Sequence, residues 1–284
     1  MLEGQEGIEW EQWLALARAA EDAGLDALFR SDHYRSIVRG EPAGALDAWA
    51  VLAALAARTE RIRLGTLVSP VTFRPAAVLA KNVVTVDHIS GGRVELGIGA
   101  GWYESEHEAY GFPFGTARSR LDELDRQLAE IERQWRSREI APPPLQRPRP
   151  PVIVGGNAKP RTVRAAVRHA DEYNTLFAEV EEIRERGRVL ERAALDAGRE
   201  PLRLSLMAGA VVGRDAAEVR ERMDAWRSVS GGAEPPRFVG TVDEVASMLR
   251  EYEAAGVERV MLQHLVHEDV DMVAVLGELA RALS

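Results

Sequence analysis

The adjacent residues Asp32 and His33 are the strongest candidates for chemistry in the sequence. A histidine can give up or take up a proton near neutral pH, because its unperturbed pKa lies there. The pair directly follows Leu25 to Phe29, an apolar run that is typical of a buried strand. The alternative is structural, with Asp32 capping the next segment and His33 serving as a buried, hydrogen-bonded imidazole. Glu3 and His264 follow comparable strand ends, where a structural role is the more common one.

A second candidate is an anion site in the run from 155 to 162, which reads Gly-Gly-Asn-Ala-Lys-Pro-Arg-Thr. The glycine turn leads into a predicted helix whose first turn contains Pro160, so free backbone N–H groups and the positive end of the helix dipole face one side. Two cations on the same side complete a possible phosphate site. A tight turn with two solvated cations explains the run equally well. The candidate residues are Gly155, Gly156, Asn157, Lys159, Arg161 and Thr162.

Several other chemistries are excluded by what the sequence lacks. It contains no Cys, which excludes disulfides, thiolate nucleophiles, iron–sulfur clusters and cysteine-bound zinc. The six His residues form no H-x-H or H-E-x-x-H motif, so no metal site is expected, and there is no G-x-S-x-G motif. The run from Gly97 to Trp102 is not a dinucleotide fingerprint, because the third glycine of G-x-G-x-x-G would fall at Trp102. Its glycines still allow the backbone to approach a planar ligand.

Charge and composition restrict the class of partner. The 36 basic and 45 acidic residues leave a net charge of -9, which disfavours nucleic acid or an anionic membrane as the main partner. The first 30 residues lack the layout of a signal peptide, and no apolar run approaches the roughly 18 residues of a membrane span. We therefore expect a cytoplasmic protein with a small-molecule substrate. Since no composition shift divides the chain, we expect residues 1–284 to form a single domain.

The elements that must position these residues alternate between helix-like stretches and short β-branched runs, which predicts βα units and a parallel sheet. The expected helices are Glu9 to Ala23, Ala48 to Thr59, Ala76 to His88, Ser119 to Arg138, Pro160 to His169, Val180 to Ala197, Ala216 to Val229 and Val242 to Ala255. The expected strands are Leu25 to Phe29, Ile62 to Val68, Val94 to Ile98, Val152 to Val154, Tyr173 to Phe177, Leu202 to Val212 and Arg259 to Leu265. Between them, Ala141 to Pro151 holds six of the 14 prolines and is expected to be extended.

An eighth strand would have to precede the first helix, where only Met1, Leu2 and Glu3 are available. A (β/α)8 TIM barrel therefore fits if strand 1 is truncated or absent, and an open doubly wound sheet is the alternative. Catalytic groups in such barrels lie at the carboxyl ends of the strands, which favours a functional role for Asp32 and His33.

Three runs of the sequence are informative in their order and spacing: LARAAEDAGLDALFRSDHY, LAARTERIRLGTLVSPVTFRPAAVLAKNVVTVDHISGGRVELGIGAGWYESEHEAYGFPF and QRPRPPVIVGGNAKPRTVRAAVRHADEYN. Together they resemble the bacterial luciferase-like flavin and deazaflavin oxidoreductase superfamily, and more closely its coenzyme F420-dependent branch. The resemblance covers nearly all of residues 2 to 180 and implies a luciferase-like barrel, usually a homodimer, with a tricyclic ring across its mouth. Relatives usually have several residues before the equivalent of EGQEG, so either translation starts upstream or the barrel has a weak seam.

The same resemblance implies where a cofactor would lie. Asp32 and His33 would lie beside the ring, with His33 near the reactive carbon. A non-prolyl cis peptide is expected against the ring, at Leu67-Val68 or at a neighbouring bond such as that to Ser69. The loop that would follow the ring and its ribityl chain contributes Gly99, Gly101, Trp102 and Glu104. The residues from 155 to 162 would meet the phosphate.

We therefore expect an F420-dependent oxidoreductase that transfers a hydride between the deazaflavin and a small organic substrate, with His33 as the acid/base group. An FMN-dependent luciferase-like monooxygenase is the enzymatic alternative, and a non-catalytic flavin-binding barrel is the alternative from another class. The sequence leaves open the choice between coenzyme F420 and FMN, and it does not identify the substrate.

Overall fold

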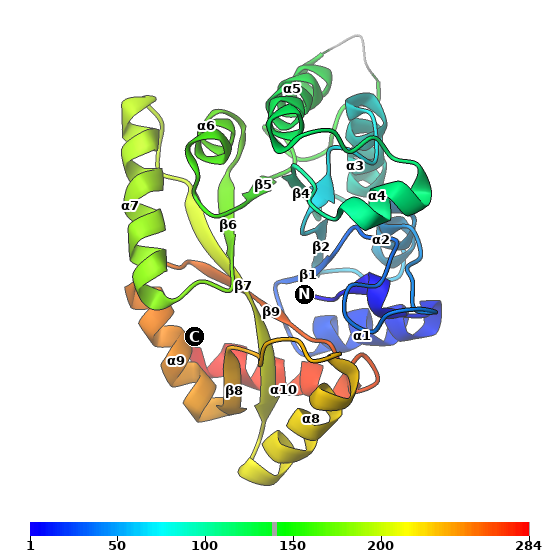
Figure 1. Ribbon diagram of the computed structural model, residues 1–284, viewed down its shortest axis with the longest axis vertical. Helices are drawn as coiled ribbons and strands as arrows, with labels where there is room; N and C mark the ends of the chain where they lie inside the picture. Colours follow the sequence, from blue (N-terminus) through cyan, green and yellow to red (C-terminus); the bar gives the residue numbers. More distant parts are fainter. Residues whose placement is uncertain (138–140, 284) are drawn as a thin grey trace.

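The strands of the chain form a parallel sheet that curls into a barrel in the computed structural model, which describes residues 1–137 and 141–283 (Figure 1). Neighbouring strands follow the order β1, β2, β4, β5, β6 and β7, and β9 also pairs with β7. Their bounds are Ala27–Arg30 for β1, Arg63–Thr66 for β2, Val94–Gly99 for β4, Val152–Gly155 for β5, Glu172–Leu176 for β6, Arg203–Gly213 for β7 and Arg259–Gln263 for β9. With Leu2 in the remaining position, these strands make the predicted (β/α)8 barrel rather than an open doubly wound sheet.

The first strand of the barrel is truncated, as the sequence predicted. Leu2 forms one parallel bridge to Arg30, at the end of β1, and another to His264, directly after β9. The barrel is therefore joined across this seam at its carboxyl end, where the functional groups of such barrels lie.

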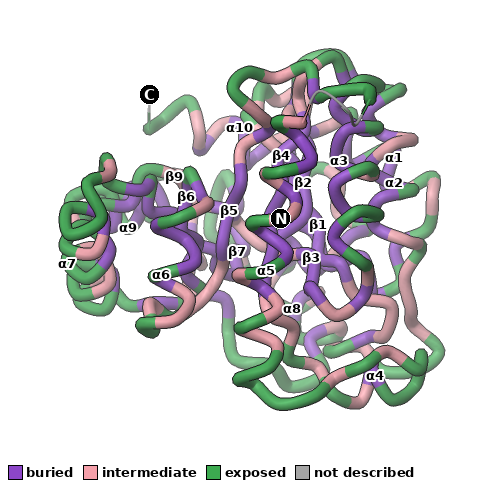
Figure 2. Tube along the Cα trace, turned by 90° about the horizontal axis from the view of Figure 1, so that it is seen from above, coloured by how far each residue is buried: buried purple, intermediate pink, exposed green. Residues whose placement is uncertain are grey.

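Helices surround the barrel and cover the outward faces of its strands. They are α1 (Trp10–Asp22), α2 (Ala48–Ala56), α3 (Ala76–Ser90), α4 (Glu104–Tyr110), α5 (Ala117–Arg136), α6 (Pro160–His169), α7 (Val180–Asp196), α8 (Ala216–Val229), α9 (Val242–Ala254) and α10 (Val270–Leu283), and a short 3-10 turn covers Gly4–Glu6. Leu28, Leu64 and Leu96 are among the strand residues that pack outward against these helices in the main apolar core. Figure 2 shows the strands buried and the outer faces of helices such as α7 exposed. The outward-facing strand residues are apolar, whereas several residues that face the barrel interior, such as Glu95 and Glu172, are charged.

The inside of the barrel holds an apolar cluster and a charged layer. Phe29, Leu67, Ile153, Met207 and Met261 form the apolar cluster. Near the amino ends of the strands, Arg259 pairs with Glu95 at 2.8 Å and with Glu172 at 3.1 Å, and both carboxylates are buried. Arg63 also pairs with Glu95. These side chains therefore fill the interior of the barrel near the amino ends of its strands.

Besides the 3-10 turn at Gly4–Glu6, four elements were not expected from the sequence: the helices α4 and α10 and the short strands β3 (Ser69–Pro70) and β8 (Phe238–Thr241). β3 extends the ladder of β4, and β8 pairs with the second half of β7, so neither adds a barrel position. The long helix predicted from Ser119 begins at Ala117, and its last predicted residue, Arg138, lies outside the described residues. Among the described residues, no helix combines the length and apolar character that crossing a membrane requires.

Candidate active site

His33 follows β1 at the carboxyl end of the barrel and is paired with a buried glutamate from α4. Its Nδ1–H donates to Oε2 of Glu106 at 2.8 Å. The other oxygen of Glu106 accepts the backbone N–H groups of Tyr34 at 2.6 Å and Arg35 at 3.0 Å. The Glu106 side chain is fully buried, whereas 15% of the His33 side chain is exposed. Glu106 therefore fixes both the ring of His33 and the loop that carries it.

This pairing sets the protonation of His33. Burial disfavours the charged ring, but the hydrogen bond to Glu106 and its negative charge outweigh burial and raise the pKa of His33. Burial likewise opposes the charge of Glu106, yet His33 and the two backbone donors lower the pKa of Glu106. Within the described part of the chain, Nε2 of His33 has no hydrogen-bond partner and is not among the buried atoms that lack one. His33 thus offers a proton at Nε2 to a ligand from outside.

Asp32, which directly precedes His33, is buried, and its carboxylate is hydrogen-bonded within the protein. It is 1% exposed, and its carboxylate accepts hydrogen bonds from Arg74 at 2.7 and 3.2 Å and from the hydroxyl of Ser69 at 2.6 Å. Arg74 also binds Asp47 at 2.7 Å. Both oxygens of Asp32 therefore have partners, and the network ties the end of β1 to the segment after β2.

The peptide bond between Leu67 and Val68 is cis although neither residue is proline, which confirms the prediction made from the sequence. The side chain of Val68 lies over strand β4, where glycines leave the necessary space. A Cβ atom on Gly99 would come within 2.6 Å of Cγ2 of Val68, and one on Gly97 would overlap the carbonyl oxygen of Thr66. Ser69, predicted to be near the cofactor, is fully buried, and its hydroxyl is bound to Asp32.

The loop after β4 places aromatic side chains next to His33. Trp102 is 61% exposed, stacks on Tyr103 at 5.2 Å between ring centroids, and meets His33 edge-on at 5.9 Å. Gly101 has a φ of 79°, and its carbonyl accepts a hydrogen bond from Arg120 at 3.1 Å. Glu104 begins α4 and is exposed. The structure thus brings His33 and Trp102 together at one end of the barrel.

At the predicted anion site, the backbone N–H groups that are free for a ligand differ from those that the sequence predicts. The N–H of Gly156 donates to the carbonyl of Asn174 at 2.9 Å, so it continues the sheet rather than facing a ligand. Tyr173 organises the turn: its hydroxyl accepts from the N–H of Ala158 at 2.9 Å and contacts the hydroxyl of Thr162 at 3.1 Å. Gly156 packs against this hydroxyl, since a Cβ atom there would lie 2.8 Å from it.

The donors that remain for an anion are at the start of α6. Within residues 1–137 and 141–283, the backbone N–H groups of Arg161 and Thr162 and the ammonium group of Lys159 have no partner. The guanidinium of Arg161 is paired with Asp122 at 3.0 Å. Asn157 is exposed in the turn. An anion at this helix start would therefore meet two main-chain donors and one lysine.

Glu3 and His264 behave differently from His33. Glu3 is buried and accepts hydrogen bonds from Gln5 at 2.9 Å and Gln263 at 2.7 Å. His264 is bound through Nε2 to the carbonyl of Asp269 at 3.0 Å, and burial lowers its pKa to about 4. His264 is therefore neutral at physiological pH and has a structural role.

One residue of the site could not be predicted from the sequence. Glu106 lies in a run that also contains Glu104 and Glu108, and nothing in the sequence shows which of the three faces His33.

A parallel barrel with a histidine after its second strand position and a non-prolyl cis peptide after its third is the arrangement that the sequence resemblance implies. The chain belongs to the luciferase-like monooxygenase family, whose profile matches residues 2–278. Members of this family are oxidoreductases or monooxygenases.

The chain is similar to proteins that use either of two cofactors. It is 32% identical over 260 residues to the phthiodiolone/phenolphthiodiolone dimycocerosates ketoreductase of Mycobacterium kansasii, covering 75% of this chain and 67% of the relative. An F420-dependent secondary alcohol dehydrogenase, in complex with an F420-acetone adduct, has the same fold, with a TM-score of 0.83 at 17% identity over 100% of this chain and 99% of that one. The FMN-bound oxygenating constituent of 3,6-diketocamphane monooxygenase from Pseudomonas putida has a TM-score of 0.76 at 18% identity. The match covers 95% of this chain and 91% of that one.

Proposed function

We propose that this protein is an F420-dependent oxidoreductase that interconverts a carbonyl compound and its alcohol, with His33 as the acid/base group. The observation that carries the proposal is the His33–Glu106 pair, which leaves Nε2 of His33 accessible beside the exposed Trp102. The raised pKa of His33 favours the protonated ring, which suits an acid that must give a proton to a carbonyl oxygen. The similar ketoreductase and alcohol dehydrogenase act in the same chemical class.

The residues present fit a ring-and-phosphate cofactor. The ring and ribityl side would be held by Leu67, Val68, Gly99, Gly101, Trp102 and Glu104. The phosphate side would be held by Asn157, Lys159 and the main chain of Arg161 and Thr162, with Gly155 and Gly156 shaping the turn before them. The unpaired N–H groups of Arg161 and Thr162 beside Lys159 supply donors that a phosphate requires. A bound deazaflavin would supply or accept the hydride, which no side chain of this chain can do.

The chain's own residues manage the proton and the position of the substrate. In the direction of reduction, Nε2 of His33 gives its proton to the carbonyl oxygen while the carbonyl carbon takes up a hydride, and an alcohol results. In the reverse direction the neutral ring takes the hydroxyl proton, and Glu106 stabilises the charge that forms on the ring. Asp32 positions the strand end through Arg74 and Ser69 and does not exchange a proton itself.

An FMN-dependent monooxygenase is the second candidate, and the fold similarity to an FMN-bound monooxygenase supports it. The non-catalytic barrel is less well supported, because Nε2 of His33 is not among the buried, unpartnered atoms of the described residues and so remains open to a ligand.

Titration of the purified protein with coenzyme F420 and, separately, with FMN decides between these candidates. We expect a saturable change in F420 fluorescence at micromolar concentrations and at least tenfold weaker binding of FMN. A tenfold difference in Kd corresponds to about 1.4 kcal/mol of binding free energy. Tighter binding of FMN would favour the monooxygenase. Binding of F420 without reduction of any ketone by the reduced cofactor would contradict the proposed activity.

Replacing Gly156 by Leu is expected to weaken binding of the phosphorylated cofactor by about 10- to 100-fold, because charge-assisted hydrogen bonds contribute about 1.5–3 kcal/mol. The new side chain would collide with the hydroxyl of Tyr173, which holds Ala158 and the start of α6 in place. Fluorescence titration measures the effect. The control is the same cofactor without its phosphate, whose affinity should change little. Equal losses for both forms would place the phosphate elsewhere.

A further inference from the structure

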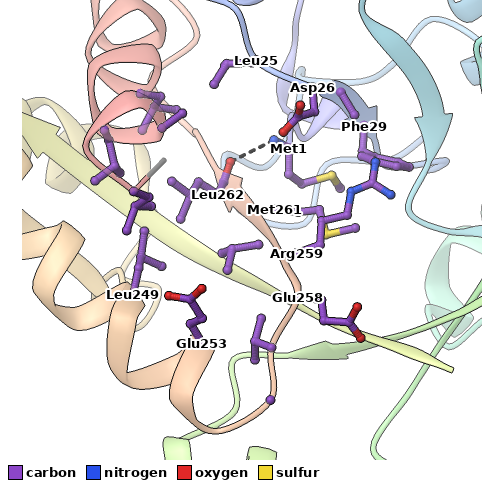
Figure 3. A pocket seen from close by; sticks show the side chains of 18 residues that line it. Met1, Leu25, Asp26, Phe29, Leu249, Glu253, Glu258, Arg259, Met261 and Leu262 are labelled. Atoms are coloured by element: carbon purple, nitrogen blue, oxygen red, sulfur yellow. Dashed lines mark hydrogen bonds between the residues drawn. The ribbon is translucent and has the colours of Figure 1, made fainter. Parts of the chain in front are cut away.

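The side chains that face the inside of the barrel change from apolar to polar toward the carboxyl ends of the strands. In the middle of the strands, the inward positions on β1, β7 and β9 are Phe29, Met207 and Met261. Figure 3 shows Met261 on the side of Phe29, and the adjacent Leu262 on the opposite side of β9. Because side chains alternate along a strand, inward positions recur at every second residue. The next inward positions toward the carboxyl end are Ser31, Gly209 and Gln263.

Four polar side chains form one hydrogen-bonded network at this level, which we call the polar floor: Glu3, Gln5, Ser31 and Gln263. The carboxylate of Glu3 accepts from Nε2 of Gln263 at 2.7 Å and from Nε2 of Gln5 at 2.9 Å. The hydroxyl of Ser31 donates to Oε1 of Gln5. Burial of such groups has a desolvation cost that the apolar cluster below does not have. Packing of the barrel alone therefore does not require them.

One acceptor of the polar floor is free. In residues 1–137 and 141–283, Oε1 of Gln263 has no hydrogen-bond partner and is not among the buried atoms that lack one. It lies beside β7, since a Cβ atom on Gly209 would come within 3.6 Å of it. The cavity at the amino ends of β1 and β9 is lined by Met261 and Leu262 but not, among the described residues, by Gln263 (Figure 3). The free oxygen is therefore open toward the carboxyl end of the barrel, where such barrels bind their substrates.

Glu3 fixes the orientation of the Gln263 amide. Its two side-chain partners in the described part of the chain are the amides of Gln5 and Gln263, and no cationic side chain pairs with it. A carboxylate can only accept, so Gln263 must turn its NH2 group toward Glu3 and its oxygen away. The charge of Glu3 is also one of those that raise the pKa of His33, so the polar floor lies close to the acid/base group. A ligand beside His33 thus meets a fixed hydrogen-bond acceptor.

We propose that Oε1 of Gln263 binds a hydroxyl group of the substrate, so that the carbonyl compound reduced beside His33 is a hydroxy ketone or hydroxy aldehyde. This inference rests on the proposed function, because it places one molecule between Gln263 and His33. The hydroxyl group donates to Gln263 while the carbonyl oxygen accepts from Nε2 of His33. A site built to bind a hydroxyl rejects the analogue that lacks it, because its own polar group then stays unpaired.

The test compares ketones that differ only by a hydroxyl or a methyl group at one position. Hydroxyacetone is paired with 2-butanone, and 4-hydroxy-2-butanone is paired with 2-pentanone, which moves the hydroxyl one carbon further from the carbonyl. The measurement is kcat/KM with reduced F420. In at least one pair the hydroxy ketone should be preferred by about tenfold or more, mainly through KM. This comparison uses the unaltered protein, so it does not depend on the folding of a variant.

Gln263→Met keeps the length of the side chain and removes the acceptor. The preference for the hydroxy ketone should then fall by about tenfold, the upper end for one neutral hydrogen bond. Gln5→Met is the matched control, because it removes the other amide from Glu3, whereas Oε1 of Gln5 is already bound to Ser31. Its preference should equal that of the wild type. An unchanged preference in Gln263→Met, or equal losses in both variants, would overturn the proposal.

A binding measurement separates this inference from the proposed function. The side-chain amide NMR signals of Gln263, identified by their absence in Gln263→Met, should shift when a hydroxy ketone is added to the F420-loaded protein, and not when its alkyl counterpart is added. Shifts without reduction of any ketone would support the hydroxyl site and contradict the proposed function. Reduction without a preference for hydroxy ketones would overturn the hydroxyl site alone. Absence of both shifts and reduction would overturn both.

Discussion

Replacing His33 by Asn is expected to slow the chemical step about 10²- to 10⁴-fold while the cofactor remains bound, because positioned proton transfer contributes about that much. Asn keeps a polar group of similar size but cannot exchange a proton at neutral pH. The measurements are cofactor affinity, melting temperature and single-turnover reduction on the same variant. If His33 only packs, stability and cofactor affinity will fall together. A stable, cofactor-saturated variant with wild-type turnover would refute the assignment.

Glu106→Gln is the companion variant, since it leaves His33 in place and removes the charge that raises its pKa. The pH profile of the chemical step should then shift, with the protonated ring lost at lower pH than in the wild type. A role in packing alone would not move the pH profile. Rescue of the profile by Glu106→Asp would support a role for the charge.

The His33–Glu106 pair should also make the free energy of unfolding depend on pH. The raised pKa of His33 stabilises the fold below the ordinary value of 6.5, and this contribution is lost as pH rises through the folded pKa. The lowered pKa of Glu106 stabilises the fold above 4.5, and this contribution is lost as pH falls through the folded pKa. Between about 4.5 and 6.5 both contributions are present, so Glu106→Gln should destabilise the protein most in that range.

Replacing Gly97 by Ala is expected to destabilise the fold by about 3 kcal/mol, toward the upper end of the range for overpacked cores. The added methyl group would overlap the carbonyl oxygen of Thr66 and come within 3.2 Å of Cγ1 of Val68. Because the first of these atoms belongs to the backbone of the neighbouring segment, no rotamer change relieves the contact. The midpoint of chemical denaturation measures the loss.

Gly187→Ala is the matched control for this substitution. Gly187 lies inside α7, and a Cβ atom there would meet Cδ2 of Leu204 at 3.6 Å, an ordinary contact. Alanine in a helix is favoured over glycine, so this variant should gain about 0.5–1 kcal/mol. Two variants with equal denaturation midpoints would show that the space beside Val68 is not required.

The elements that the sequence predicts well are helices with a clear hydrophobic periodicity and strands that form an apolar run between turns. Val180 to Ala197, for example, differs from α7 by one residue at its end. α4 was missed because seven residues make too few turns to show a helical period. α10 was missed in part because Gly277 weakens a helix. The structure shows why it is there: a Cβ atom would come within 2.6 Å of the carbonyl of Ala23, at the end of α1.

A residue of the candidate site could be predicted where its position at the end of a strand already indicates a functional role. His33 could be found because it follows a strand, and the cis bond after Leu67 because a family resemblance located it. Glu106 could not be found, since its contact with His33 joins positions 73 residues apart and depends on how α4 folds back over the barrel. The N–H of Gly156 was assigned to a ligand because the sequence does not show that the sheet continues through it.

The charged layer at the bottom of the barrel constrains how this protein can change over generations. Arg259 serves both Glu95 and Glu172, and burial raises the pKa of Glu172 while Arg259 and Arg63 hold that of Glu95 down. Loss of the shared arginine would leave Glu172 without its nearest cation and Glu95 with Arg63 alone, and breaking such a buried pair costs about 3–5 kcal/mol. Replacement of the whole layer by apolar residues is often neutral. Homologues should therefore inherit these positions together, either all charged or all apolar.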